Sequence, residues 1–204
     1  MVEAIWMERN AIVHGEAPKQ INTILRSVCN SFAFYSSTQS LPAGPARWEL
    51  PPTPWIKINV DAAIRAEESV GAAVARDHQG VVLAIKTTLL SSPDPITAEA
   101  LAMLLGLEVA RAYSWPYVVV ESDCLNLLNS WNGGSEVPWQ ATHVFKQMRD
   151  LMISFSQVVI TFVSRECNYF AHNLASWAYV CSSFDTLNPS EVSAAVCQDH
   201  FWWD

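Results

Sequence analysis

The chain has 204 residues, and half of them are hydrophobic, including nine tryptophans. This composition argues against wholesale disorder and is typical of one domain of ordinary size with extensions. The formal net charge of −8 at pH 7 argues against bulk electrostatic affinity for nucleic acid. A polyanion would have to bind through a local basic patch or a bridging metal ion.

Composition also bears on location and cofactors. We find no window of about 18 uncharged apolar residues, and the N-terminus lacks the basic, apolar and small residues, in that order, of a signal peptide. We therefore expect a soluble intracellular protein, in the nucleus or cytoplasm, without a membrane partner. The five cysteines are scattered without a CxxC pair, so we predict neither a zinc site nor a disulfide framework and interpret them as buried thiols.

The N-terminal part differs from the rest of the chain. Residues 2–14 and 19–35 have apolar side chains spaced between charged ones, which predicts two short helices. The stretch "SSTQSLPAGPARWELPPTP" that follows is rich in Ser, Pro and Gly and predicts a linker. We divide the chain into an N-terminal helical region, a linker, a globular domain and a C-terminal extension without assigned structure, at residues 1–37, 38–54, 55–180 and 181–204.

Three strands are predicted at the start of the globular domain. The segments "WIKINVDAAI", "SVGAAVARD" and "VVLAIKTTLL", at residues 55–64, 69–77 and 81–90, have the composition and alternation of strands. The last two are separated by "HQG" at 78–80, which is typical of a turn. Short connections of this kind predict an antiparallel meander.

Helices and strands then alternate. Asp94 and Pro95 begin a helix that runs to about Tyr113, with Asp as the N-cap and Pro at the first helical position. The segment "YVVVESD" (117–123) is apolar and ends in acids, the pattern of a buried parallel strand. We predict further helices at 124–131, 138–155 and 168–180, and a last strand at 157–165. This order predicts an α/β domain whose five-stranded mixed sheet, a meander plus two parallel strands, is flanked by helices.

Three acids stand out by position, and each has two interpretations. Asp61 follows "INV" in the first strand, where an aspartate is either a solvated cap or a ligand. Glu99 is the one ionisable residue of "ITAEALAMLLGL"; either it is buried and needs a partner charge or metal, or it faces water near the helix N-terminus. Asp123 ends a parallel strand, where α/β sheets place ligand sites, but it also precedes a helix that it could cap.

Taken together, the three acids favour a ligand role. They come from three elements, each at a strand end or in a first helical turn, and can converge at one edge of the sheet. Glu121, two residues before Asp123, is a spare acid on the same strand face. Hard divalent cations take carboxylate ligands. Two such ions about 3.5–4 Å apart can activate a water and stabilise the leaving oxygen in phosphodiester cleavage.

The segments "WIKINVDAAI", "TAEALAMLLGLEVA", "VVVESDCLNLLN" and "FVSRECNYFAHNLASWA" together resemble the ribonuclease H-like superfamily. They are most similar to plant ribonuclease H-type domains related to non-LTR retrotransposon reverse transcriptases. The resemblance covers about residues 48–179. The upstream "AIWMERNAIVHG" is similar to the segment that ends the reverse-transcriptase portion of such elements. We therefore interpret residues 1–50 as a retrotransposon-derived remnant.

The resemblance implies an endonuclease that cleaves the RNA strand of RNA–DNA hybrids with two Mg²⁺ or Mn²⁺ ions held by four carboxylates. Carried over by motif, Asp61 would bridge both metals, Glu99 would hold the metal on the side of the attacking water, and Asp123 would help to orient the pair. In the last predicted helix, Asn168 matches the family, but His172 replaces the fourth acid. A neutral imidazole can ligate Mn²⁺ but is a poor ligand for Mg²⁺.

The same resemblance assigns two positions to the substrate, an RNA–DNA hybrid or another nucleic acid. Where the family often carries a mobile His before its last helix, "SRECN" has Arg165. Arg165 either contacts a phosphate or is a solvated surface arginine. Asn168 and Arg165 are the predicted substrate-binding residues, and the predicted catalytic residues are Asp61, Glu99, Asp123 and His172.

Other functions stay open. The replacement of the fourth acid by His172 leaves a catalytically weak or inactive domesticated relative as the alternative, acting as a nucleic-acid or protein binding module. A small-molecule α/β domain is disfavoured, because no Gly-rich phosphate loop follows any predicted strand.

Overall fold

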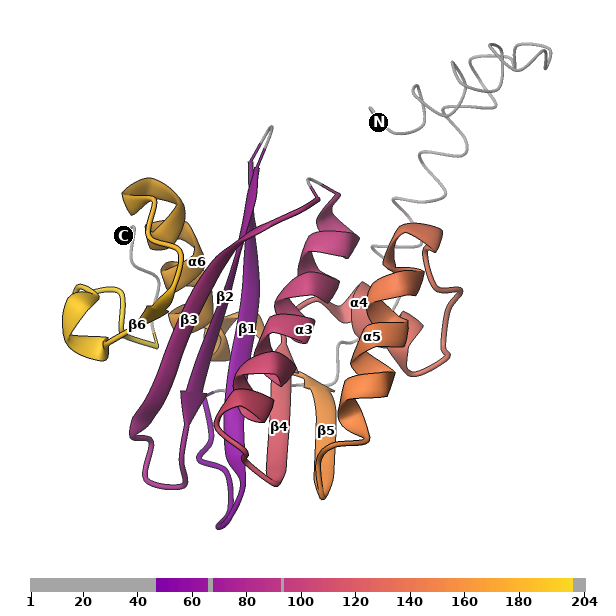
Figure 1. Ribbon diagram of the computed structural model, residues 1–204. Helices are drawn as coiled ribbons and strands as arrows, with labels where there is room; N and C mark the ends of the chain where they lie inside the picture. Colours follow the sequence, from indigo (N-terminus) through magenta and orange to yellow (C-terminus); the bar gives the residue numbers. More distant parts are fainter. Residues whose placement is uncertain (1–46, 66–67, 93, 200–204) are drawn as a thin grey trace. The chain divides into compact units, whose positions relative to one another are not determined.

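The computed structural model describes residues 47–65, 68–92 and 94–199. The two predicted N-terminal helices, residues 1–46 of the predicted reverse-transcriptase remnant and part of the predicted linker lie outside this part. Within it, six strands form one mixed sheet in the order β5-β4-β1-β2-β3-β6 (Figure 1). The strands are β1 (Ile56–Ile64), β2 (Ser69–Arg76), β3 (Val82–Leu90), β4 (Tyr117–Ser122), β5 (Gln157–Phe162) and β6 (Thr186–Leu187).

The pairing confirms the predicted meander and the two parallel strands. Strands β1, β2 and β3 pair antiparallel, whereas β4 pairs parallel with both β1 and β5. The β1–β4 ladder ends where Asn59 faces Glu121. Asp61 therefore lies two residues beyond the last pair of this ladder, at the point where β1 and β4 part.

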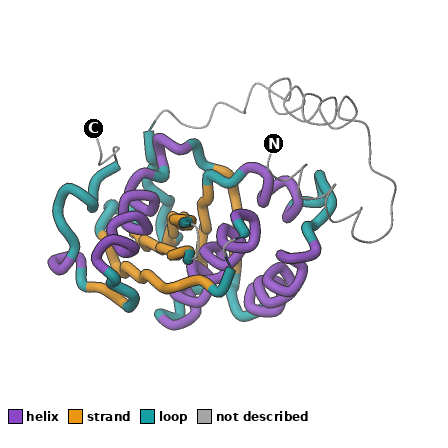
Figure 2. The backbone as a smooth tube through the Cα atoms, turned by 90° about the horizontal axis from the view of Figure 1, so that it is seen from above, coloured by secondary structure: helices purple, strands orange, loops and turns teal. Residues whose placement is uncertain are grey.

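Helices cover both faces of the sheet, with α6 on one side and α3, α4 and α5 on the other (Figures 1 and 2). Their bounds are α3 (Pro95–Ala112), α4 (Leu125–Trp131), α5 (Thr142–Met152) and α6 (Tyr169–Cys181). None of the helices in the described residues has the length and apolarity that a membrane crossing needs. The α/β architecture flanked by helices is thus as the sequence predicts.

Each face of the sheet has its own apolar core. On the α3 face, Ile58 and Val60 of β1 are fully buried in one cluster with Met103. On the α6 face, Ala63 of β1 belongs to a second cluster with Leu174. Because successive strand residues point to opposite faces, Asn59 and Asp61 share the α6 face with Ala63.

Helix α3 begins where the sequence predicts and lies close against the sheet. Asp94 is its N-cap, and the carboxylate accepts a hydrogen bond from the Thr97 amide at 2.9 Å. A Cβ atom at Gly106 would lie 2.8 Å from Cγ1 of Val60. The absence of a side chain at this glycine therefore lets α3 approach β1 closely, and this approach positions Glu99 of the same helix.

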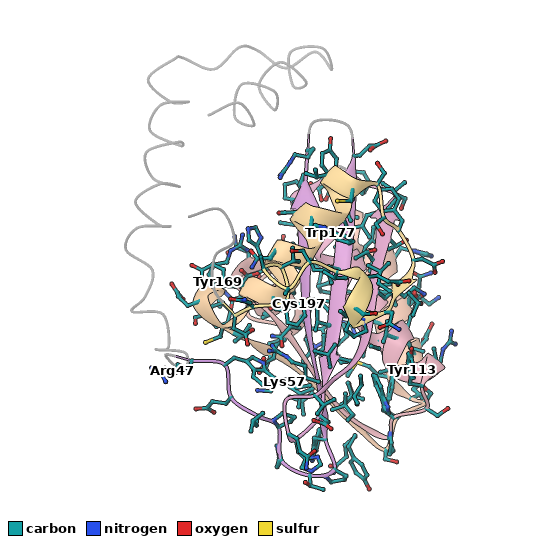
Figure 3. All side chains as sticks on the ribbon, turned by 90° about the vertical axis from the view of Figure 1, so that its left-hand side faces the viewer. Arg47, Lys57, Tyr113, Tyr169, Trp177 and Cys197 are labelled. Carbon is teal, nitrogen blue, oxygen red and sulfur yellow. The ribbon has the colours of Figure 1, made fainter. Side chains whose placement is uncertain are left out.

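The C-terminal extension, left without assigned structure from sequence, packs on the sheet as far as Asp199. The short strand β6 pairs antiparallel with β3 and adds a sixth strand to the five predicted. Val192 and Val196 are buried in the core of the α6 face. Figure 3 views this face, where Trp177 marks α6 and Cys197 marks the C-terminal segment. The folded domain therefore continues beyond residue 180.

One predicted helix is divided in the structure. The segment 138–155 forms a 3₁₀ turn at Trp139–Ala141 followed by α5, which ends at Met152. The remaining strands and helices begin and end within a few residues of their predicted bounds.

Candidate active site

Three carboxylates singled out in the sequence come from three elements. Asp61 lies inside β1, Glu99 near the start of α3, and Asp123 directly after β4. The side chains of Asp61 and Asp123 are 1% and 8% exposed. Glu99 is partly exposed, but its Oε2 atom is buried and has no hydrogen-bond partner. We call these three residues the acid cluster.

The charges of the three carboxylates influence one another. Burial, and then the charges of Asp61 and Asp123, raise the pKa of Glu99 well above its usual value, against a smaller lowering by Arg165. Burial and then the charge of Asp61 raise the pKa of Asp123, again against Arg165. Like charges thus gather where β1 and β4 part, and the site favours any cation that reaches them.

Arg165 is a cation that reaches the acid cluster. It begins the 3₁₀ turn Arg165–Cys167 that precedes α6. Its Nη1 atom donates to Oδ1 of Asp61 at 3.2 Å and to Oδ2 of Asp123 at 2.5 Å. Burial lowers the pKa of Arg165, but the charges of Asp61 and Asp123 outweigh this and raise it. The guanidinium therefore bridges two of the three acids.

His172 of α6 completes this arrangement. Its Nδ1 atom lies 3.0 Å from Oδ2 of Asp61 and 2.8 Å from Nη2 of Arg165. Depending on its tautomer, the imidazole either donates to the carboxylate or accepts from the guanidinium. Hydrogen bonds thus connect Asp61, Asp123, Arg165 and His172, whereas Glu99 interacts with this group through the charges of Asp61, Asp123 and Arg165.

The structure does not show the capping roles that the sequence left open for Asp61 and Asp123. Asp61 is almost fully buried inside β1, so it is not a solvated strand-end cap. The N-cap of α4 is Cys124, which has no side-chain capping hydrogen bond. The Asp123 carboxylate contacts Arg165. Both carboxylates therefore contact Arg165, and neither has the capping role that the sequence left open.

A second polar group, which the sequence analysis missed, surrounds Asn59. The buried side chain of Asn59 accepts hydrogen bonds from Nε1 of Trp48 and Nη2 of Arg76, both at 2.9 Å. Its Nδ2 atom donates to Glu121 at 3.0 Å and to Asn168 at 3.2 Å. The alternation of Asn and Asp in "INVD" places both on one strand face, and this signal could have indicated that Asn59 has a polar neighbourhood.

The charges around Asn59 are paired. Nζ of Lys57 lies 2.8 Å from Oε1 of Glu121; Figure 3 labels Lys57. Arg76 lies 2.8 Å from the Asp199 carboxylate. Its guanidinium also lies 3.5 Å from the centre of the Trp48 ring. We call the whole group the Asn59 network, made of Trp48, Lys57, Asn59, Arg76, Glu121, Asn168 and Asp199.

Asn168 fastens the start of α6 to β1. Its side chain is fully buried, and Nδ2 donates to the carbonyl oxygen of Val60 at 3.0 Å. Its own carbonyl accepts from the His172 amide at 3.1 Å. These contacts hold His172 beside Asp61. Substrate binding by Asn168 stays a prediction; the geometry favours a positioning role.

The chemistry of the acid cluster suits a hard divalent cation, because its ligands would be three carboxylates. One of their oxygens, Oε2 of Glu99, is buried without a hydrogen-bond partner. Across the described ranges, however, no three or more His, Cys, Asp and Glu side chains are arranged to hold a metal ion. Between Asp61 and Asp123, the guanidinium of Arg165 contacts both carboxylates. The donor set fits in kind, and a cation between these two acids requires Arg165 to leave.

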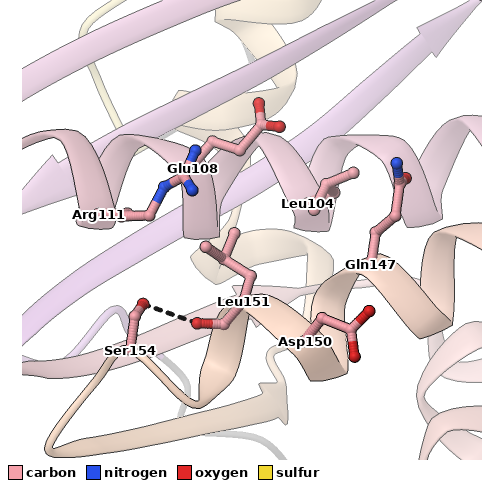
Figure 4. A pocket seen from close by; sticks show the side chains of 7 residues that line it. All are labelled: Leu104, Glu108, Arg111, Gln147, Asp150, Leu151 and Ser154. Atoms are coloured by element: carbon pink, nitrogen blue, oxygen red, sulfur yellow. Dashed lines mark hydrogen bonds between the residues drawn. The ribbon is translucent and has the colours of Figure 1, made fainter.

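A separate cleft of about 340 Å³ lies between α3 and α5 (Figure 4). It is lined by Leu104, Glu108, Arg111, Gln147, Asp150, Leu151 and Ser154. The Ser154 hydroxyl donates to the Leu151 carbonyl at 2.7 Å. None of these lining residues belongs to the acid cluster, so the cleft is not part of the candidate site.

The mixed sheet and the flanking helices form the ribonuclease H-like fold that the sequence resemblance implies. A family model described as "Reverse transcriptase-like" matches residues 59–178. This match spans more than half of the chain, and the chain belongs to this family. A comparison with curated proteins found no match.

Solved structures share the fold at low sequence identity. Ribonuclease H1 from the halophilic archaeon Halobacterium salinarum is 20% identical, with a TM-score of 0.59 over 62% of this chain and 98% of that one. The N-terminal ribonuclease H domain of a Mycobacterium tuberculosis protein, solved as a fusion with maltose-binding protein, is 20% identical, with a TM-score of 0.57 over 63% and 96%.

A third structure was solved with nucleic acid. LC11-RNase H1, isolated from compost by a metagenomic approach, is 18% identical in its complex with an RNA/DNA hybrid. Its TM-score is 0.57 over 62% of this chain and 98% of that one. These likenesses show the fold of the described domain.

Proposed function

We propose that the chain is a divalent-metal-dependent endonuclease of ribonuclease H type that hydrolyses the RNA strand of RNA–DNA hybrids. The acid cluster carries this proposal. Three carboxylates from β1, α3 and the end of β4 share one site, and burial and mutual repulsion raise the pKa of two of them. Such a site stabilises a cation and suits Mg²⁺ or Mn²⁺. The RNA/DNA hybrid bound to LC11-RNase H1 supports the choice of substrate.

In this proposal, Asp61, Glu99 and Asp123 hold the ions. When bound, a pair of Mg²⁺ or Mn²⁺ ions supplies an activated water and neutralises charge on the leaving oxygen. The burial of Asp61 within β1 fixes its carboxylate, and Asn168 holds α6 so that His172 lies at the fourth ligand position. The Arg165 side chain is 46% exposed, and once it leaves the acids it can contact a phosphate of the substrate.

A second candidate function is a binding module with little or no cleavage. Two observations favour it: Arg165 contacts two of the acids that would hold the metal, and His172 replaces the fourth acid. In that case the domain would bind nucleic acid or a protein partner without needing a divalent ion.

Cleavage of a labelled hybrid distinguishes these two functions. The purified chain is mixed with an RNA–DNA hybrid whose RNA strand carries the label, in Mg²⁺, in Mn²⁺ and in EDTA. We expect cleavage of the RNA strand in the presence of metal and a loss of at least about 100-fold in Asp61→Asn, since a ligand of the cation is then removed. Asp150→Asn, the same change at an exposed position of α5, should cleave like the wild type.

The other outcomes identify which proposal fails. Hybrid binding that persists in EDTA, with no cleavage in either metal, would favour the binding module. Cleavage that Asp61→Asn leaves intact would contradict the assignment of the acid cluster.

A further inference from the structure

The Arg165 guanidinium and the two carboxylates that it contacts are held in the fold in different ways. Asp61 and Asp123 are nearly buried, and they are fixed in a strand and directly after one. Arg165 reaches them from a 3₁₀ turn, and its side chain is 46% exposed. A long side chain of this kind regains rotamer freedom and hydration when it turns to solvent. The acids therefore stay in place, whereas the guanidinium can withdraw.

The guanidinium also leaves the cluster incompletely neutralised. It contacts Asp61 and Asp123, but Oε2 of Glu99 stays buried without a hydrogen-bond partner. A buried carboxylate oxygen without a partner is costly. A divalent cation that lay among all three acids would balance more negative charge than Arg165 does.

We propose that Arg165 is a displaceable internal cation, which neutralises Asp61 and Asp123 in the metal-free protein and competes with divalent ions for the acid cluster. This inference rests on the proposed function, because it takes a metal site at the acid cluster as given. Since Arg165 and the cation occupy the same place, part of the intrinsic metal affinity is offset by the loss of the arginine contacts. Arg165 thereby sets the divalent-ion concentration that the site requires.

Calorimetric titration with MnCl₂ alone, without nucleic acid, tests this competition on the full chain. We expect Arg165→Gln to bind Mn²⁺ about tenfold more tightly than the wild type, because a charge-assisted contact no longer has to be broken. Arg165→Lys keeps a cation and should stay within about threefold of the wild type. Lys146→Gln removes the same charge from an exposed position of α5 and should leave the affinity unchanged.

Thermal unfolding gives a second measure. In EDTA, we expect Arg165→Gln to unfold at a lower temperature than the wild type, because the carboxylates then repel one another without a counter-ion. Saturating Mn²⁺ should raise the unfolding temperature of Arg165→Gln by more than it raises that of the wild type.

A measurement on the wild type covers the case in which Arg165→Gln does not fold. The guanidinium resonance of Arg165, assigned by its absence from the spectrum of Arg165→Lys, should shift in a saturable way on titration with MgCl₂. Metal binding without a shift of this resonance would overturn the inference.

The outcomes separate the inference from the proposed function. Mn²⁺ binding of equal strength in the wild type and Arg165→Gln would overturn the competition by Arg165 and leave the nuclease standing. If neither folded protein took up Mn²⁺, both proposals would fall.

Discussion

Asn59 and Asp61 lie on the same face of β1, two residues apart, but the charges of the polar groups around them are balanced to different degrees. In the Asn59 network, Lys57 and Arg76 face Glu121 and Asp199, so that two cations meet two carboxylates. In the acid cluster, Arg165 contacts two of the three carboxylates, and Glu99 keeps a buried oxygen without a hydrogen-bond partner. The first group is balanced in charge, although Nε of Arg76 also lacks a hydrogen-bond partner, and the second is not balanced.

The two arginines show the same contrast. Arg76 is 5% exposed and stacks on the Trp48 ring, whereas Arg165 is 46% exposed and begins a 3₁₀ turn. A buried, paired network ties distant segments together and serves the fold. An unbalanced group that keeps a route to solvent lowers stability and is expected where a ligand is bound. This difference favours a structural role for Asn59 and supports the proposed role of Asp61 as a metal ligand.

The largest expected effect is a difference in the free energy of unfolding between variants of Asn59 and of Asp61. Asn59→Leu removes four side-chain hydrogen bonds, and we expect it to lower the free energy of unfolding by about 3 kcal/mol or more, since its buried partners lose contacts. Asp61→Asn relieves repulsion while it weakens the contacts with Arg165, and should change stability by less than about 1 kcal/mol. Urea unfolding in EDTA measures both. Equal losses of unfolding free energy in the two variants would contradict the different roles of Asn59 and Asp61.

The next effect is the pH dependence of stability that the acid cluster causes when no metal is bound. Because the pKa of Glu99 is raised in the folded protein, that protein holds a proton more tightly than the unfolded chain does. Stability therefore falls as the pH rises above the usual carboxyl value of 4.5, until it passes the folded-state value. Asp123 contributes in the same direction.

Glu99→Gln should remove the larger part of this dependence. We expect the variant to be more stable than the wild type at pH 8 by about 2 kcal/mol, because a carboxylate with a buried oxygen that lacks a hydrogen-bond partner is lost. The gain should shrink at pH 4. Glu108→Gln, at an exposed position of the same helix, is the matched control and should follow the wild type at both pH values. A variant curve parallel to that of the wild type would contradict the raised pKa of Glu99.

The smallest effect concerns the fourth ligand position. His172 lies 3.0 Å from the Asp61 carboxylate, so His172→Asp would add a further oxygen donor. We expect Mg²⁺-supported cleavage to rise about tenfold, and Mn²⁺-supported cleavage to rise less, because imidazole serves Mn²⁺ better than Mg²⁺. Initial rates on a labelled hybrid measure the change, with His143→Asp on the exposed face of α5 as the control. An unchanged or lower rate would show that His172 is not a defect.

Much of the fold could be predicted from local patterns. Strand alternation located the meander, and the Asp94–Pro95 pair located the start of α3, because these signals depend on neighbouring residues alone. Strand β6 was missed because two residues carry too little pattern, and its position depends on pairing with β3. The division of 138–155 was missed because the apolar pattern runs through a 3₁₀ turn and a helix alike.

The candidate site could be predicted only in part. The three acids were visible because each interrupts an apolar segment or ends one. The position of the Arg165 guanidinium depends on how a turn before α6 meets the ends of β1 and β4, and no spacing in the sequence encodes it. The role of Asn59 depends on partners from Trp48 to Asn168, which the fold alone brings together.

The central claim is that the acid cluster binds divalent cations where Arg165 now lies. Crystals grown with MnCl₂, measured near the manganese absorption edge, test it most directly. We expect an anomalous peak at about 2.1 Å from carboxylate oxygens of Asp61, Glu99 or Asp123, with Arg165 turned to solvent. Saturating Mn²⁺ with no peak at these residues, and the guanidinium still between Asp61 and Asp123, would contradict it.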